Sequence, residues 1–153
     1  MLKKTSILAP VLASILAPVL AVVLGLSFFA LPGLAGETPA PAGAKVYFIG
    51  LADGDTVSSP VVVRFGLSGM GVAPAGTEKE GTGHHHLIVN AELPSLDEPI
   101  PADENYRHFG GGQTEVSIEL PAGQHTLQLL LGDHNHIPHN PPVTSERITI
   151  TVK

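Results

Sequence analysis

The sequence has 153 residues, and its 8 Lys and Arg against 14 Asp and Glu give a formal net charge of −6. This acidic balance, without a basic stripe, argues against nucleic acid or an anionic lipid surface as a partner. The chain has no cysteine, which excludes disulfides, thiolate metal sites and cysteine catalysis. A metal site in this protein must therefore use imidazole, carboxylate or methionine ligands.

The first 35 residues have the pattern of an export segment. Two lysines precede an uncharged apolar run at residues 7–34, which ends in the small residues that a signal peptidase reads. We expect cleavage before Gly36. The alternative is an uncleaved anchor, because the run is long enough to cross a bilayer, although three prolines interrupt it. In both cases we expect a periplasmic or extracellular domain, which touches the membrane only if residues 1–35 remain uncleaved.

Removing residues 1–35 leaves 153 − 35 = 118 residues and takes away two lysines, so the net charge becomes −8. Residues 36–44 are rich in Pro, Ala and Gly and are interpreted as a linker. Residues 45–153 are predicted to form one domain, which is long enough to bury a core without disulfides.

Period-two patterning broken by turn residues runs through this domain, with almost no helical periodicity. The predicted strands span residues 45–50, 60–67, 84–92, 114–120, 125–132 and 146–152. An irregular segment at residues 93–113 contains three consecutive glycines from Gly110. These glycines do not form a phosphate loop, and we interpret them as supplying unusual backbone angles or room for a closely approaching segment. The pattern predicts an immunoglobulin-like antiparallel β-sandwich of about seven strands.

Seven of the eight histidines fall into three groups, and the eighth is His125. The groups are His84, His85 and His86; His108; and His134, His136 and His139. In the predicted sandwich, strand 84–92 lies beside strand 125–132, so the first and third groups are expected at one end of the fold. His108 is expected to reach this end from the second sheet, and His125 to lie at the opposite end with a structural role.

The histidine spacing is suited to metal binding. His84 and His86 point to the same face of a strand, and His134 and His136 repeat the spacing at a strand end. The candidate ligands are His84, His86, His134 and His136, with His108 and His139 in reserve. Neutral imidazoles favour copper(II) first and zinc second. The structural alternative is that His84–His86 form a polar strand start, that His134 and His136 bond loop carbonyls, and that His139 shapes its loop.

Two other function classes remain open from the residues alone. One is an envelope interaction module that binds a protein, glycan or anion through Tyr106, Arg107 and His108. The other is a metal-dependent enzyme that uses Glu80 or Asp133 as acid or base, although no enzymatic activity follows from the sequence. Asp133 is also suited to orienting a histidine or to an Asx-type loop bond, and we favour the loop bond.

Several motifs in the second half of the chain resemble one known family. They are GHHHLIV at residues 83–89, RHFGGGQTE at 107–115, PAGQHTLQL at 121–129, HIPH at 136–139 and PPV at 141–143. They resemble domain-of-unknown-function family 4399, a group of small secreted bacterial proteins. The resemblance covers roughly residue 81 to the C-terminus. It implies an exported, compact β domain, but it implies no activity, substrate or catalytic residue.

Overall fold

The computed structural model describes residues 36–153, so the predicted export segment lies outside the described residues. This part of the chain contains nine strands and no helix. The strands are β1 (Lys45–Ile49), β2 (Thr56–Val57), β3 (Val61–Ser68), β4 (Gly71–Val72), β5 (Thr82–Val89), β6 (Tyr106–Phe109), β7 (Glu115–Ile118), β8 (Gly123–Gly132) and β9 (Ile148–Val152). Among the described residues, no helix is long and apolar enough to cross a membrane.

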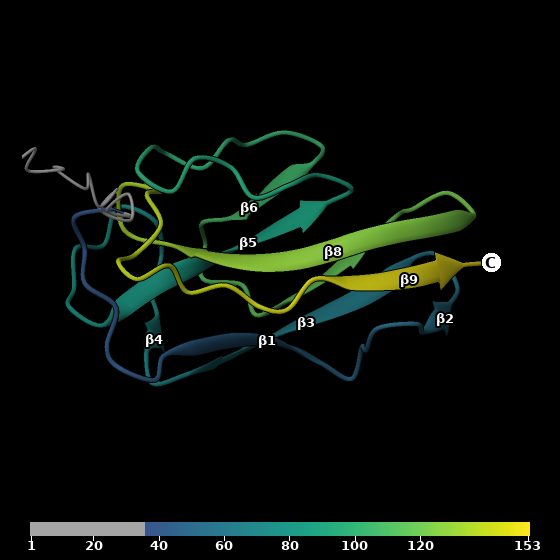
Figure 1. The fold of residues 1–153 in the computed structure, drawn as a ribbon, viewed down its shortest axis with the longest axis horizontal. Helices are drawn as coiled ribbons and strands as arrows, with labels where there is room; N and C mark the ends of the chain where they lie inside the picture. Colours follow the sequence, from purple (N-terminus) through teal and green to yellow (C-terminus); the bar gives the residue numbers. More distant parts are fainter. Residues whose placement is uncertain (1–35) are drawn as a thin grey trace, which may run out of the picture. The chain divides into compact units, whose positions relative to one another are not determined.

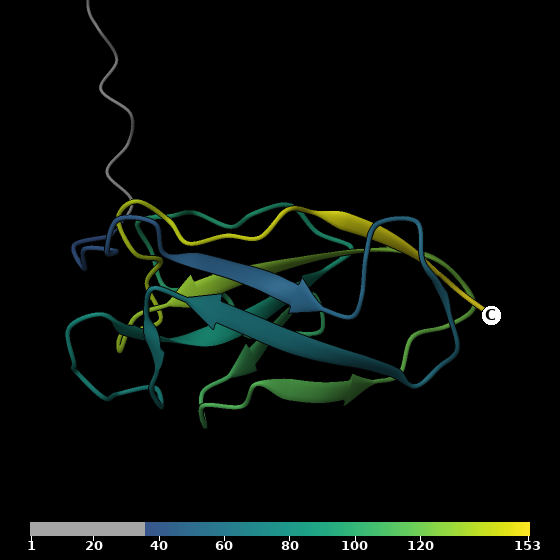
Figure 2. The same ribbon diagram turned by 90° about the horizontal axis from the view of Figure 1, so that it is seen from below.

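The strands form two sheets that lie over each other as two layers (Figures 1 and 2). One sheet has the order β1-β3-β7, and the other has the order β2-β9-β8-β5-β4, with β6 also paired to β5. Seven of the nine strands have four or more residues. The predicted all-β sandwich is confirmed.

The core between the sheets follows the alternation seen in the sequence. On β3, Val61, Val63 and Phe65 are at most 3% exposed, whereas the intervening Val62 is 46% exposed. Leu127 and Leu129 on β8 are fully buried in the same core. Each such side chain contributes about 1.5–3 kcal/mol through burial. Truncating one of them, for example Leu129→Ala, would cost about 2–5 kcal/mol of stability.

A second, smaller cluster covers the outer face of the larger sheet. It contains Ile88 of β5, Leu130 of β8 and Ile100 from the segment between β5 and β6. Strand β5 therefore lies between two apolar layers, and its last seven residues are all buried. Polar residues on β5 are consequently shielded from water on both faces of the sheet.

One part of the predicted arrangement is wrong. The sequence predicts an irregular segment at residues 93–113 and predicts that His108 arrives from the second sheet. Residues 106–109 form β6, which pairs antiparallel with β5 in the same sheet and sets His108 opposite His86. A four-residue strand is too short for its alternation to stand out in the sequence, which explains the error. The predicted neighbourhood of β5 and β8 is confirmed, with Gly132 opposite His84.

Residues 36–40, interpreted as part of a linker, run beside the loop that follows β8. Pro39 forms a parallel bridge with Asn140, and Ala40 packs against the main core. This contact joins the start of the described chain to the histidine-bearing loop.

Candidate metal centre

Three consecutive histidines on β5 divide between the two faces of the sheet. Side chains alternate along a strand, so His84 and His86 share the outer face, and His85 points into the main core. The three side chains are at most 1% exposed. His85 packs against Phe65, with ring centroids 5.0 Å apart, and is separated by the sheet from its two neighbours.

His108 joins His84 and His86 from the neighbouring strand. Its Cα is paired with that of His86, and paired residues place their side chains on the same face. The ring centroid of His108 is 5.0 Å from that of His86 and 5.0 Å from that of His84. His108 is exposed, so it forms the solvent side of the cluster.

His136 completes the cluster from the loop after β8. Its ring centroid lies 4.7 Å from that of His108, 5.0 Å from that of His84 and 6.2 Å from that of His86. His136 has a φ of 69°, in the left-handed region that costs a non-glycine residue about 1–2 kcal/mol. Backbone strain of this kind concentrates at functional sites, where the surrounding structure holds it. We call His84, His86, His108 and His136 the histidine cluster.

Three residues of the histidine cluster, His84, His86 and His108, have nitrogen atoms close enough to share one ion. The Nε2 atoms of His84 and His86 are 3.0 Å apart, and one nitrogen from each of His84, His86 and His108 lies within 4.8 Å of the others. Imidazole nitrogens about 2.0–2.1 Å from an ion stand about 2.9 Å apart on the edge of a square plane and about 3.3 Å apart in a tetrahedron. The separation of 3.0 Å falls in this range. His84, His86 and His108 can therefore hold a metal ion, and the ring of His136 lies beside that of His108.

Burial and mutual repulsion keep the inner histidines neutral. Burial, together with the nearby His108 and His136, lowers the pKa of His84 to about 4, although the charge of Asp133 opposes the shift. Burial, followed by the effects of His84 and His108, lowers the pKa of His86 to about 2. Burial also lowers the pKa of His108. Metals bind neutral imidazoles, so at neutral pH a metal does not have to displace an acid proton from His84 or His86.

Two glycines, which have no side chain, leave room for the rings of His108 and His86. A Cβ on Gly110 would overlap Cε1 and Nε2 of His108, and a Cβ on Gly132 would lie 3.0 Å from Nε2 of His86. Gly112 has a φ of 80°, which is the unusual backbone angle expected within this glycine run. The sequence indicated that the run gives room to a neighbouring segment, but not that the neighbour is the His108 ring itself.

A family comparison agrees with the motifs in the sequence. The family model described as "Domain of unknown function (DUF4399)" matches residues 63–153, which is more than half of the chain. The chain belongs to this family. The match begins within β3 and includes all four residues of the histidine cluster. No curated protein and no solved structure matches the chain.

Two of the candidate ligands in this DUF4399 domain lie outside the histidine cluster. The side chain of His134 bonds the neighbouring Asn135 at 2.9 Å and lines a separate groove of about 480 Å³. His139 is fully buried, and its Nε2 lies 3.1 Å from the carbonyl oxygen of Thr82, to which it donates. The structure thus separates His136 from His134, because His136 alone has the left-handed backbone. This angle cannot be read from residue spacing.

His125 lies at the other end of β8 and has the expected structural role. Its Nδ1 lies 2.9 Å from Nδ2 of Asn90, and its Nε2 lies 2.8 Å from the carbonyl oxygen of Pro121. Both ring nitrogens are thus bonded within the protein. Met70, the one methionine among residues 36–153, packs against the main core.

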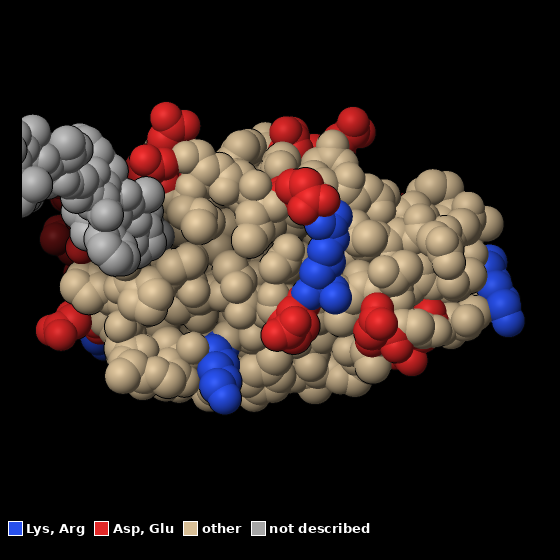
Figure 3. All heavy atoms as spheres, viewed as in Figure 1, with Lys and Arg blue, Asp and Glu red and all other residues tan. Residues whose placement is uncertain are grey.

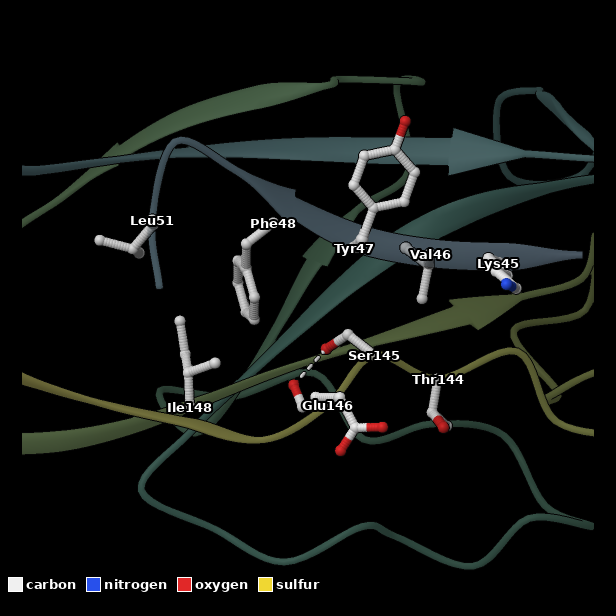
Figure 4. A pocket seen from close by; sticks show the side chains of 9 residues that line it. All are labelled: Lys45, Val46, Tyr47, Phe48, Leu51, Thr144, Ser145, Glu146 and Ile148. Atoms are coloured by element: carbon white, nitrogen blue, oxygen red, sulfur yellow. Dashed lines mark hydrogen bonds between the residues drawn. The ribbon is translucent and has the colours of Figure 1, made fainter. Parts of the chain in front are cut away.

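An apolar groove lies away from the histidine cluster. It has a volume of about 540 Å³ and lies between β1 and the segment leading into β9 (Figure 4). Its lining residues are Lys45, Val46, Tyr47, Phe48, Leu51, Thr144, Ser145, Glu146 and Ile148. None of these is a histidine, so the groove and the histidine cluster are separate features.

Charged side chains do not form a basic surface on the face shown in Figure 3. The Lys and Arg side chains on that face are few and separated from one another, and acidic groups lie among them. Arg147 is paired with Glu92 at 2.6 Å. Basic side chains therefore form no continuous patch on this face.

Proposed function

We propose that this protein is exported to the cell envelope and binds a transition metal there, with copper(II) preferred over zinc. The ligands are His84, His86, His108 and His136. Export is supported by the pattern of residues 1–35, and the metal by an all-imidazole donor set in a chain without cysteine. At equal availability, divalent copper binds nitrogen ligands more tightly than zinc does.

One observation carries the metal proposal. Four imidazoles from β5, β6 and the loop after β8 face one another, and two of them are fully buried with their Nε2 atoms 3.0 Å apart. Burying polar groups costs free energy unless each finds a partner. An ion shared by the rings would satisfy several nitrogens at once, which a single proton between His84 and His86 cannot do.

The interaction-module alternative has weaker support. Tyr106 and Arg107 are engaged within the domain, since Tyr106 donates to the carbonyl oxygen of Glu92 at 2.9 Å and Arg107 to that of Glu104 at 3.3 Å. Arg107 and His108 also point to opposite faces of β6. The three side chains therefore do not converge on one ligand. The enzyme alternative is also weakened, because both carboxylate oxygens of Asp133 already accept hydrogen bonds.

The test uses protein purified without a polyhistidine tag. Bound metal is measured first, and copper(II) and zinc are then titrated into the stripped protein. We expect one ion per chain, and a loss of affinity of a hundredfold or more when His84 and His86 are both changed to alanine. His125→Ala is the matched control and should leave the affinity unchanged. Absence of binding, or equal losses in both variants, would refute the proposal.

A further inference from the structure

The loop that carries His136 is organised by the carboxylate of Asp133. One oxygen, Oδ1, accepts hydrogen bonds from the backbone amides of Asn135 at 2.8 Å and Ile137 at 2.9 Å. The amide of His136 donates to the carbonyl oxygen of Asp133 at 3.0 Å. These bonds close a tight turn around His136. They are the Asx-type bonds favoured by the sequence, and they act on His136 through the backbone.

The second oxygen of Asp133 is held by the start of the described chain. Thr38 Oγ1 donates to Asp133 Oδ2 at 2.6 Å, across 95 residues of sequence. Asp133 is 3% exposed. Burial alone would raise its pKa, but the hydrogen bonds from Thr38, Ile137 and Asn135 outweigh burial and leave the pKa lowered. The carboxylate is therefore ionised and fully engaged at neutral pH.

Backbone bonds fasten the same segment to the far side of the loop. Asn140 N donates to Thr38 O at 2.9 Å, and Ala40 N donates to Asn140 O at 2.9 Å. Gly36 N donates to Leu96 O at 3.0 Å, and a Cβ on Gly36 would overlap the carbonyl oxygen of Pro138. Residues 36–40 thus follow the loop closely from one side to the other. We call them the N-terminal strap.

His136 needs such support because its backbone is strained. A residue other than glycine keeps a φ of 69° only where its surroundings fix it. The carbonyl of His136 accepts a hydrogen bond from Ile100 N at 2.8 Å, which fixes the outer side of the turn. Asp133 fixes the inner side, and Thr38 fixes Asp133.

We infer that Thr38 and Asp133 are positioning residues for His136, so that the N-terminal strap determines whether the fourth imidazole reaches the ion. The inference rests on the proposed metal function. Neither residue contacts the ion, and each acts through the loop. The outer supports of metal ligands commonly change affinity by 10- to 100-fold when removed.

The test compares Thr38→Val, which removes the hydroxyl at nearly constant shape, with Thr38→Ser, which keeps it. Thr149→Val on β9 is a matched control, because Thr149 is also half-buried but lies in the half of the sheet away from the loop. Copper(II) affinity is measured by competition, and the number of bound imidazoles by pulsed electron paramagnetic resonance. We expect Thr38→Val to lose about tenfold in affinity and one imidazole, and Thr38→Ser and Thr149→Val to lose neither.

A double variant separates positioning from general destabilisation. Thr38→Val combined with His136→Ala should bind copper no more weakly than His136→Ala alone, because the strap acts only through that ring. Fully additive losses would overturn the inference. If the unaltered protein binds no metal, the proposed function fails instead. The His136 ring signals in the metal-free protein then decide the inference, which stands if Thr38→Val shifts or broadens them and fails if they are unchanged.

Discussion

Histidines at the two ends of the β5–β8 ladder differ in how their ring nitrogens are bonded. At one end, His125 bonds Asn90 and Pro121 through its two ring nitrogens, at 2.9 and 2.8 Å. At the other end, the rings of the histidine cluster face one another, and Nδ1 of His86 is buried without a hydrogen-bond partner among the described residues. His125 therefore stabilises the fold through hydrogen bonds at both ring nitrogens. The facing histidines, in contrast, can hold a metal ion among them.

His85 provides a third case on the same strand. Both of its ring nitrogens are buried without a hydrogen bond of normal geometry in the described part of the chain. Burial lowers its pKa, and the backbone of Gln113 opposes that shift only in part. Its ring packs against Phe65 as an apolar side chain would. Burial alone therefore does not define the site, whereas the convergence of several rings does.

Adding and removing the metal is the strongest test of the difference between the histidine cluster and His125. Copper(II) at a thousand times its dissociation constant should stabilise the protein by about 4 kcal/mol, because the ion binds only the folded state. The measurement is thermal unfolding with and without copper and after chelation. His86→Ala should lose the stabilisation and His125→Ala should keep it. If copper stabilised both variants equally, the two ends would not differ in function.

Acid should destabilise the metal-free protein because the histidine cluster is protonated more readily in the unfolded chain than in the fold. Unfolded histidine has a pKa of about 6.5, whereas His84 in the fold has a pKa of about 4. Between these values the unfolded chain binds more protons, so stability is greatest above about pH 6.5 and is lost as the pH falls towards 4. The pKa of Asp133 is lowered, so its contribution is lost only below the usual carboxyl range.

Denaturant unfolding between pH 7 and pH 5 measures this acid effect. The control is a variant with His84→Gln and His86→Gln, which should lose less stability over the same interval. His85 and His108 also have lowered pKa values and remain in the variant, so part of the acid sensitivity should persist. An unchanged pH dependence in the variant would contradict the assignment to the cluster.

His125→Ala tests the structural end directly. The change leaves the amide of Asn90 and the carbonyl of Pro121 without their partner, which should cost about 2 kcal/mol of stability. Copper affinity should stay within about twofold, since the ring lies at the far end of β8 from His84 and His86. Urea unfolding measures the loss of stability, and copper competition measures the affinity. A loss of copper binding without a loss of stability would mean that His125 serves the metal and not the fold.

Much of the fold could be predicted from the sequence, because two-residue alternation is a strong signal in long strands. The inward positions of β3 and β8, and the pairing of β5 with β8, follow from it. The position of His108 could not be predicted, because β6 has four residues and forms only by pairing with β5. The separation of His136 from His134 depends on one left-handed backbone angle that Asp133 and Thr38 hold. Such long-range contacts leave no trace in local spacing.

The smallest expected effect comes from a single methyl group beside His108. Gly110→Ala would place a Cβ where the His108 ring lies, and a ring at the end of a side chain moves more readily than the backbone. Stability should therefore change little, while copper affinity falls by about tenfold, equal to about 1.4 kcal/mol.

Gly111→Ala is the matched control, because its Cβ would meet only the flexible side chain of Gln113, at 3.1 Å. Both glycines lie in the same turn, but a Cβ on Gly110 would also lie 3.2 Å from Cβ of Ala75. A weaker copper complex for Gly110→Ala alone would show that His108 binds the ion through the position of its ring. Equal affinities would mean that this exposed histidine is dispensable and that the buried pair with His136 holds the metal.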